Sequence, residues 1–183
     1  MDHSFFAAGQ VNTVSLDLDG NCERVLEVCR RARERGIKLV AFPELVLTGY
    51  DCGDFFNVPA FMSESARAVL SLKYSLPEGV TAGVGAVLPG SDGRAYDAYV
   101  ILKRGKILGI SAVSSFNDSR DQRVRNLTTA AYGERFILGA ETFVSSNIVE
   151  VDGVKVGVHF PPADIPSLQG VDLAISPAVE RFE

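Results

Sequence analysis

The first 42 residues constrain the fold more than any other part of the chain, because they follow a strand–helix–strand pattern. Residues 5–16 begin with an apolar run and end in polar residues, which predicts a buried strand with a polar exit. Residues 22–36 predict a helix that ends at Gly36, with apolar side chains at helical spacing: Cys22, Val25, Leu26, Cys29 and Ala32. Residues 37–42 (IKLVAF) predict a strand buried on both faces. Such a unit pairs its strands in parallel through a right-handed crossover, so we expect an α/β fold.

The remaining pattern adds one helix and several strands. The helix is predicted over residues 63–73, and the strands over residues 80–88, 96–102, 106–113, 143–151, 154–160 and 171–175. Lys103-Arg104-Gly105 predicts a three-residue hairpin loop, and Asp152-Gly153 predicts a tighter hairpin. Residues 114–133 are polar and aperiodic, which predicts a long loop. Without a repeat or a linker, we expect a single domain over residues 1–183, built as a layered sheet sandwich.

Composition and charge argue against several classes of function. The net charge of −5 and a pI near 5.1 do not suit a nucleic-acid groove or an anionic membrane surface. No apolar stretch approaches the roughly 20 residues that span a bilayer, and residues 1–4 lack the basic start of a secretory signal. The three cysteines form no disulfide framework, so we expect a reduced, cytoplasmic chain. Residues 17–21 (DLDGN) are one residue too short for a calcium loop, and we expect neither a metal nor a cofactor.

Residues 40–56 (VAFPELVLTGYDCGDFF) join a buried strand directly to a carboxylate. Glu44 follows the strand at a place where partial desolvation raises a carboxyl pKa toward the range of a general base. A structural alternative is a strand-end carboxylate that accepts backbone N–H bonds. The residues alone leave both interpretations open.

This segment resembles the nitrilase, or carbon–nitrogen hydrolase, superfamily, and more narrowly the glutamine amidotransferase domain of the glutamine-dependent NAD synthetase family. The resemblance rests on Phe42-Pro43-Glu44-Leu45 and on residues 47–56 (LTGYDCGDFF). Weaker matches are residues 102–109 (LKRGKILG) and 154–158 (VKVGV). The resemblance implies a four-layer αββα sandwich. It also implies a Cys-Glu-Lys triad that releases ammonia from glutamine through a thioester, to supply NAD synthesis in a synthetase domain.

The resemblance assigns roles to three residues of this chain. Glu44 takes the position of the general base. Tyr50 takes the position of a tyrosine that contacts glutamine, with packing on a loop as the alternative. Glu134 resembles a second glutamate that supports the catalytic lysine, with an ion pair to Arg135 as the alternative.

The other two members of the triad have no counterpart in the sequence. Residues 110–118 (ISAVSSFND), where the family has its lysine, hold no Lys or Arg, and Lys103 and Lys106 belong to a hairpin that we expect to be solvated. The position of the nucleophilic cysteine falls on Pro161, which also lacks a backbone N–H for an oxyanion hole. The alternative nucleophiles are Cys52, in a loop, and His159, in an apolar strand. Cys22 and Cys29 are expected in the core.

These departures favour a degenerate glutaminase-type domain of an NAD synthetase-related protein. No pyrophosphate-binding S-G-G-x-D-S motif is present, so the chain lacks a synthetase domain and would work with one in a longer protein. It stops before the family sheet is complete, so we expect a sandwich truncated at its C-terminal end that forms a homo-oligomer. The alternatives are an active amidase with displaced catalytic residues, and a non-catalytic module that binds a small ligand or serves as a scaffold.

Overall fold

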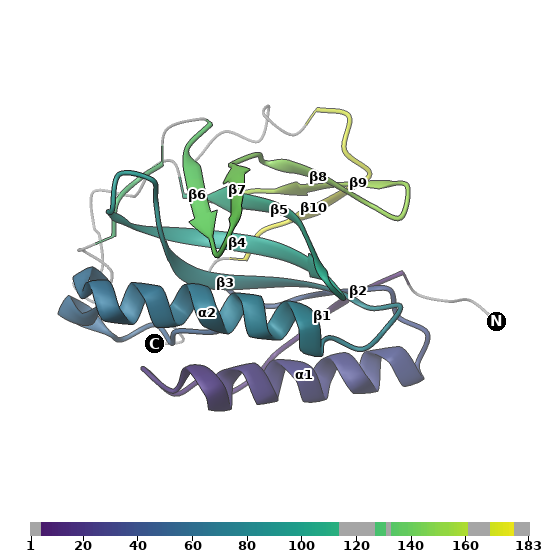
Figure 1. Cartoon of the computed structure of the whole chain (residues 1–183). Coiled ribbons are helices and arrows are strands. Elements are labelled where there is room, and N and C mark those ends of the chain that lie inside the picture. Colours follow the sequence, from purple (N-terminus) through teal and green to yellow (C-terminus); the bar gives the residue numbers. More distant parts are fainter. Residues whose placement is uncertain (1–4, 114–126, 131–132, 161–168, 178–183) are drawn as a thin grey trace, which may run out of the picture.

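The computed structural model describes residues 5–113, 127–130, 133–160 and 169–177 and confirms a mixed α/β fold of stacked layers (Figure 1). The helices are α1 (Leu18–Glu34), α2 (Pro59–Ser75) and a short 3-10 helix η1 (Gly53–Asn57). The strands are β1 (Phe6–Ala8), β2 (Leu39–Ala41), β3 (Thr81–Pro89), β4 (Ala95–Lys103), β5 (Lys106–Ala112), β6 (Arg135–Leu138), β7 (Glu141–Val144), β8 (Ile148–Val151), β9 (Val154–Val158) and β10 (Leu173–Ile175).

The first sheet follows the chain order β1-β2-β3-β4-β5. Its strands β1, β2 and β3 are parallel, which confirms the crossover that the strand–helix–strand pattern predicts. From β3 to β5 the pairing is antiparallel. The second sheet has the order β10-β9-β8, with β10 parallel to β9, and β6 and β7 form a separate two-stranded ribbon.

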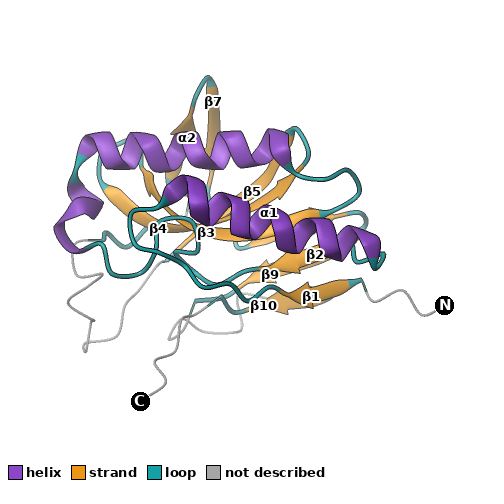
Figure 2. Ribbon diagram, turned by 90° about the horizontal axis from the view of Figure 1, so that it is seen from below, coloured by secondary structure: helices purple, strands orange, loops and turns teal. Residues whose placement is uncertain are grey.

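Helices α1 and α2 cover one face of the first sheet, and the second sheet faces the other side (Figures 1 and 2). Strand β4 shows this division residue by residue. Its Ala98, Val100 and Leu102 join the helix-side core, whereas Tyr99 and Ile101 join the core between the sheets. In the described part of the chain, no helix covers the outer face of β8–β10, so three of the four expected layers are seen.

Helix α1 has the predicted apolar spacing, but it begins at Leu18, before the predicted start at Cys22, and ends at Glu34. Asp17 is the N-cap, and its carboxylate accepts the Gly20 N–H at 3.0 Å. Of the five apolar positions, Val25, Leu26, Cys29 and Ala32 are buried and Cys22 is half-buried. Helix α2 is longer than predicted, because it begins at Pro59, a residue suited to a first helical position.

The strands differ from the prediction in four ways. The first strand is short, because Gly9 packs directly on the Phe42 ring and the chain then leaves the sheet. The strand predicted over residues 143–151 is broken into β7 and β8, since Ser146 bonds through its hydroxyl to Ile148 and replaces the ladder locally. Strand β6 was not predicted. The hairpin between β4 and β5 has two turn residues, not three, because Lys103 and Lys106 pair.

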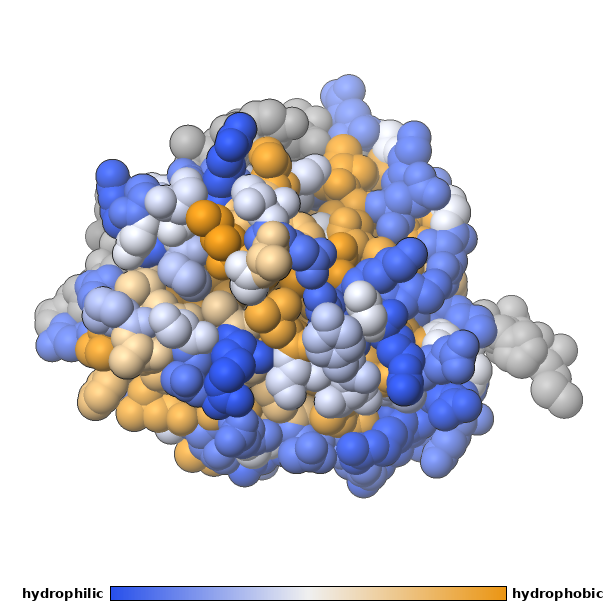
Figure 3. Space-filling view, viewed as in Figure 1, coloured by the Kyte–Doolittle hydropathy of each residue, from blue (hydrophilic) through white to orange (hydrophobic). Residues whose placement is uncertain are grey.

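The solvent-facing surface is mostly polar around the helices, and apolar atoms gather over the β6–β7 ribbon (Figure 3). Ile137 and Val144 on this ribbon are 52% and 58% exposed. No helix in the described residues is both long and apolar enough to cross a membrane.

Candidate active site at the ends of beta2, beta9 and beta10

Glu44 lies three residues beyond β2, at the carboxyl end of the parallel strands, and is half-buried. The next residue, Leu45, has a φ of 55°, an uncommon conformation for a bulky side chain. The Glu44 N–H donates to the carbonyl oxygen of Pro177, just after β10, at 2.6 Å. Because Ile175 of β10 pairs with Val158 of β9, this bond places the ends of β9 and β10 on the same side as Glu44.

The segment that carries Glu44 is held tightly against β3. The Phe42 N–H donates to the Gly83 carbonyl at 2.8 Å, and the Leu47 N–H donates to the Gly85 carbonyl at 3.0 Å. A Cβ atom at Gly85 would lie 2.4 Å from the Glu44 Cα, so the backbone around Glu44 packs directly on the sheet.

A buried asparagine fixes the same segment from the helix side. The Asn21 side chain is fully buried, and its amide nitrogen donates to the carbonyl oxygens of Leu47 and Val14 at 3.0 and 2.8 Å. Its oxygen accepts the Val14 N–H and one Arg24 N–H. Asn21 therefore ties α1, the loop before it and the Glu44 segment into one rigid unit.

Asp97 of β4 is a site residue that the sequence reasoning missed. Its side chain is 3% exposed, and burial, followed by the negative charge of Glu44, raises its pKa well above the ordinary value near 3.8. The sequence signal that could have revealed Asp97 is an acidic residue in the apolar interior of the strand AYDAYVILK.

Tyr50 lies on the same segment as Glu44. It is half-buried and packs against the apolar cluster formed by Leu45, Cys52, Phe56, Met62, Val87, Ala95 and Leu127. The structure thus places Tyr50 close to the residue after Glu44, and its contact with a ligand stays a prediction.

Glu134 belongs to a separate group of polar side chains near the β3–β4 turn. Its carboxylate lies 3.4 Å from the Tyr96 hydroxyl and accepts the Arg135 backbone N–H at 3.0 Å. The Tyr96 hydroxyl also donates to Asp92 at 2.9 Å, and burial together with Asp92 raises the Tyr96 pKa. Tyr96 and Asp97 are neighbours on β4, so their side chains leave the sheet on opposite faces. The described contacts therefore do not join Glu134 to the Glu44–Asp97 pair, and its catalytic role stays a prediction.

All three cysteines of the chain lie within the described residues, and none has the character of an activated thiol. Burial raises the pKa values of Cys22 and Cys29, both on α1, to about 12. The Cys52 thiol lies 3.2 Å from the Thr48 carbonyl oxygen, and burial raises its pKa as well. A nucleophilic cysteine needs a lowered pKa, so the raised pKa values do not suit these thiols to nucleophilic attack. They serve as packing groups in the core or against it.

The remaining predictions for the site have different outcomes. Lys103 is not simply solvated, because it forms an ion pair with Asp152 of the β8–β9 turn. His159 is half-buried, and its backbone N–H donates to Ile175 at 2.8 Å. Pro161 and residues 114–126, where the family nucleophile and lysine would align, lie outside the described residues.

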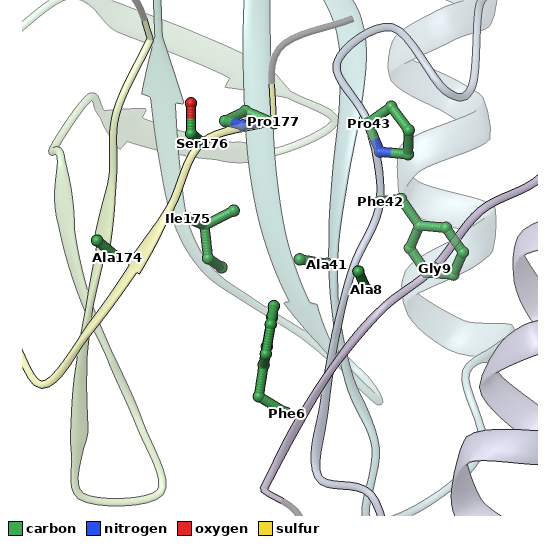
Figure 4. A pocket seen from close by; sticks show the side chains of 10 residues that line it. All are labelled: Phe6, Ala8, Gly9, Ala41, Phe42, Pro43, Ala174, Ile175, Ser176 and Pro177. Carbon is green, nitrogen blue, oxygen red and sulfur yellow. The ribbon is translucent and has the colours of Figure 1, made fainter.

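A cavity of about 210 Å³ opens beside the Glu44 segment, between the ends of β1, β2 and β10 (Figure 4). Its lining residues are Phe6, Ala8, Gly9, Ala41, Phe42, Pro43, Ala174, Ile175, Ser176 and Pro177. Pro43 and Pro177 bring it next to Glu44, although Glu44, Tyr50 and Glu134 do not line it. In the described ranges, no cluster of three His, Cys, Asp or Glu side chains could hold a metal ion.

The two stacked sheets, with Glu44 after the second parallel strand, fit the carbon–nitrogen hydrolase sandwich that the sequence resemblance implies. The sequence model of the carbon–nitrogen hydrolase family matches residues 6–160, so the chain belongs to this family. This finding confirms the resemblance to the nitrilase superfamily.

Curated relatives narrow the similarity. The chain is 29% identical over 154 residues to a glutamine-dependent NAD(+) synthetase of Thermotoga maritima, with 81% of this chain and 24% of that protein covered. It is 31% identical over 99 residues to a glutamine-dependent NAD(+) synthetase of Rhodobacter capsulatus, with 54% of this chain and 18% of that protein covered. The chain thus spans about a quarter or less of these relatives.

Solved structures agree on the fold. A glutamine-dependent NAD(+) synthetase from Cytophaga hutchinsonii has a TM-score of 0.85 at 18% identity, with 97% of this chain and 30% of that chain covered. An amidase from Nesterenkonia sp. AN1 in complex with acrylamide has a TM-score of 0.71 at 14% identity, with 96% of this chain and 65% of that chain covered.

Proposed function

We propose that this chain is a glutaminase-type domain that binds glutamine or a similar small amide near Glu44 without hydrolysing it. It keeps the general-base position and the strand ends that form a carbon–nitrogen hydrolase site. It lacks the nucleophile and the lysine at the positions where the family has them.

The observation that carries this proposal is the state of the thiols. The chain has three cysteines: Cys29 and Cys52 are buried, Cys22 is half-buried against the helix-side core, and burial raises the pKa of each thiol. Amide hydrolysis through a thioester needs a thiolate that attacks the carbonyl carbon while a base takes its proton. Cys52 is the thiol nearest to Glu44 in sequence, and its Sγ lies 3.2 Å from the Thr48 carbonyl oxygen, so this thiol is directed at a backbone acceptor.

The relatives support the choice of ligand. Two of them are glutamine-dependent by name, and the amidase from Nesterenkonia was solved with acrylamide, a small primary amide. In a longer protein related to these synthetases, the domain would sit beside a synthetase domain and hold glutamine or ammonia for it. Residues 1–183 are proposed to form this one domain.

The test measures ammonia release and binding separately. Purified chain is incubated with glutamine, and Glu44→Gln serves as the matched control. No release above the control, together with glutamine binding by the wild type, supports the proposal. Glu44-dependent release would show an active amidase with displaced residues, and Cys52→Ala would then identify the nucleophile.

Thiol accessibility gives a second test of the same point. Labelling by an aromatic disulfide at neutral pH should be slow at all three cysteines, because the attacking species is the thiolate. One fast-reacting cysteine would contradict the proposal.

A scaffold without a ligand is the alternative that the cavity in Figure 4 keeps open, since Glu44 does not line it.

Self-association also stays a prediction. Strands β1 and β10 lie at the edges of their sheets, and such edges favour pairing between chains. Light scattering of the purified chain tests it directly.

A further inference from the structure

Asp97 lies on the face of β4 against which the Glu44 segment packs. It stands on β4 opposite Val87, and its carbonyl oxygen accepts the Val113 N–H at 3.0 Å. Asp97 therefore lies between β3, on which the Glu44 segment packs, and the end of β5. Tyr99, two residues along the same face, donates its hydroxyl to the Phe42 carbonyl oxygen at 2.9 Å, which places that face under the Glu44 segment.

The Asp97 carboxyl has an unused oxygen. Its Oδ1 has no hydrogen-bond partner within the described residues. Ser65 and Thr81 also have buried side-chain oxygens without partners, but those are neutral hydroxyls, which cost less to bury than a carboxyl. Buried polar atoms in native proteins are nearly always paired, so the unpaired carboxyl oxygen marks a place for a donor.

The carboxyl groups around the unpaired Asp97 oxygen determine which kind of ligand donor would bind there. Glu44 is the charged group that acts on Asp97, and both residues are acids. Two neighbouring carboxyl groups repel an anionic ligand and favour N–H donors, most strongly a cationic one. The buried position excludes competing water, which strengthens such a bond.

We propose that Asp97 and Glu44 together form a subsite for an N–H donor head group, either the amino group of a primary amide or an ammonium ion. This inference rests on the proposed function, because it places the ligand nitrogen in the same site. It adds Asp97 as the residue that accepts from that nitrogen, and it explains why a carboxyl is retained in the interior of β4.

Ligand-dependent thermal unfolding of the full chain tests the subsite near neutral pH. The probes are ammonium chloride, acetamide and glutamine, and the controls without N–H groups are potassium chloride and sodium acetate. The variants are Asp97→Leu and Asp97→Ala, each of which removes both oxygens. Asp172→Asn is the matched control, because Asp172 is exposed on the second sheet.

We expect an N–H probe to raise the midpoint of unfolding of the wild type and of Asp172→Asn. In Asp97→Leu the apparent Kd should weaken by about tenfold or more, the loss expected when one buried hydrogen bond is removed. An Asp97→Leu protein that binds within about twofold of the wild type would overturn the inference, as would the failure of all three probes to bind the wild type.

The outcomes separate this inference from the proposed function. Glutamine binding that is insensitive to Asp97 contradicts the subsite alone. Asp97-dependent binding of ammonium without any binding of glutamine supports the subsite and contradicts the amide-binding function. If Asp97→Leu does not fold, Asp97→Ala decides, since unchanged ammonium binding by that variant, which also lacks both oxygens, overturns the inference.

Discussion

The ends of β2 and β9 lie on the same side of the sandwich, yet only the segment after β2 carries the residue that the family motif requires there. After β2 the chain retains Glu44 in an uncommon backbone geometry, with Leu45 at a φ of 55°, and fastens it to β3, α1 and β10. The chain after β9 reads His159-Phe160-Pro161-Pro162, with no thiol. Here Val158 and Phe160 are buried between the sheets, so the described end of β9 serves packing.

This difference suggests that binding and bond cleavage were separable in this fold. Under the proposed function, the rigid β2 end holds a ligand by itself, whereas cleavage would also need a nucleophile at the β9 end. Changes at the β2 end should therefore cost more, in stability and in ligand binding, than changes at His159.

Gly85→Val should have the largest effect. The added side chain would collide with the Leu45 backbone nitrogen, 2.2 Å from a Cβ at this position, and with the Glu44 Cα. We expect a loss of at least about 3 kcal/mol in the free energy of unfolding, measured by chemical denaturation.

Gly79→Ala is the control for this prediction. Gly79 has a φ of 82° and open space around it, so its substitution tests backbone strain alone and should cost about 1 kcal/mol. Equal losses at Gly85 and Gly79 would argue that the close packing under Glu44 is unimportant.

Asn21→Leu should come second. The change leaves the Val14 N–H and the Leu47 carbonyl oxygen without their partner, which should cost about 2–3 kcal/mol. Glutamine binding should weaken as well, because Leu47 lies three residues after Glu44. The exposed Asn12→Leu is the control, and an Asn21→Leu protein as stable as this control would contradict the role assigned to Asn21.

Asp97→Asn should change how stability depends on pH. The pKa of Asp97 is raised in the folded state, so folding retains a proton that the unfolded chain releases above about 3.8. The wild type should therefore lose stability as pH rises from this value toward the folded pKa, and Asp97→Asn should lack this loss. Unfolding curves from pH 4 to 9 measure the gap, and parallel curves would show that Asp97 is not under this strain.

His159→Ala should have the smallest effect. Within the described residues, His159 makes its hydrogen bond through the backbone N–H, and the alanine keeps that bond. We expect a change of at most about 0.5–1 kcal/mol in stability and unaltered glutamine binding. Lost ligand binding in a stable His159→Ala protein would move the functional centre from the β2 end to the β9 end.

Local patterns predicted much of the fold because the determinants lie within a few residues. The spacing of Val25, Leu26 and Cys29 predicted α1, and Asp152-Gly153, both with positive φ, predicted the β8–β9 turn. The break between β7 and β8 escaped prediction because the local Ser146–Ile148 bonds are only part of its cause. The Ser145 and Ser146 N–H groups also donate to the carbonyl oxygens of Glu134 and Ile110, which are more distant in sequence.

The candidate site divides in the same way. Sequence resemblance singled out Glu44 and Tyr50, because they belong to one continuous motif, and it predicted that the nucleophile and the lysine are missing at their positions. It could not select Asp97, whose importance depends on burial and on the nearness of Glu44, 53 positions earlier in the chain.

The sequence by itself determined the family, the strand–helix–strand opening and the absence of a cysteine after β9, because each is written in short local patterns. Only the tertiary structure decided that Cys29 and Cys52 are buried and Cys22 half-buried, and that one oxygen of the buried Asp97 carboxyl lacks a partner within the described residues. Burial and pairing are set by packing between distant segments, and they govern which groups are charged and which are left to meet a ligand.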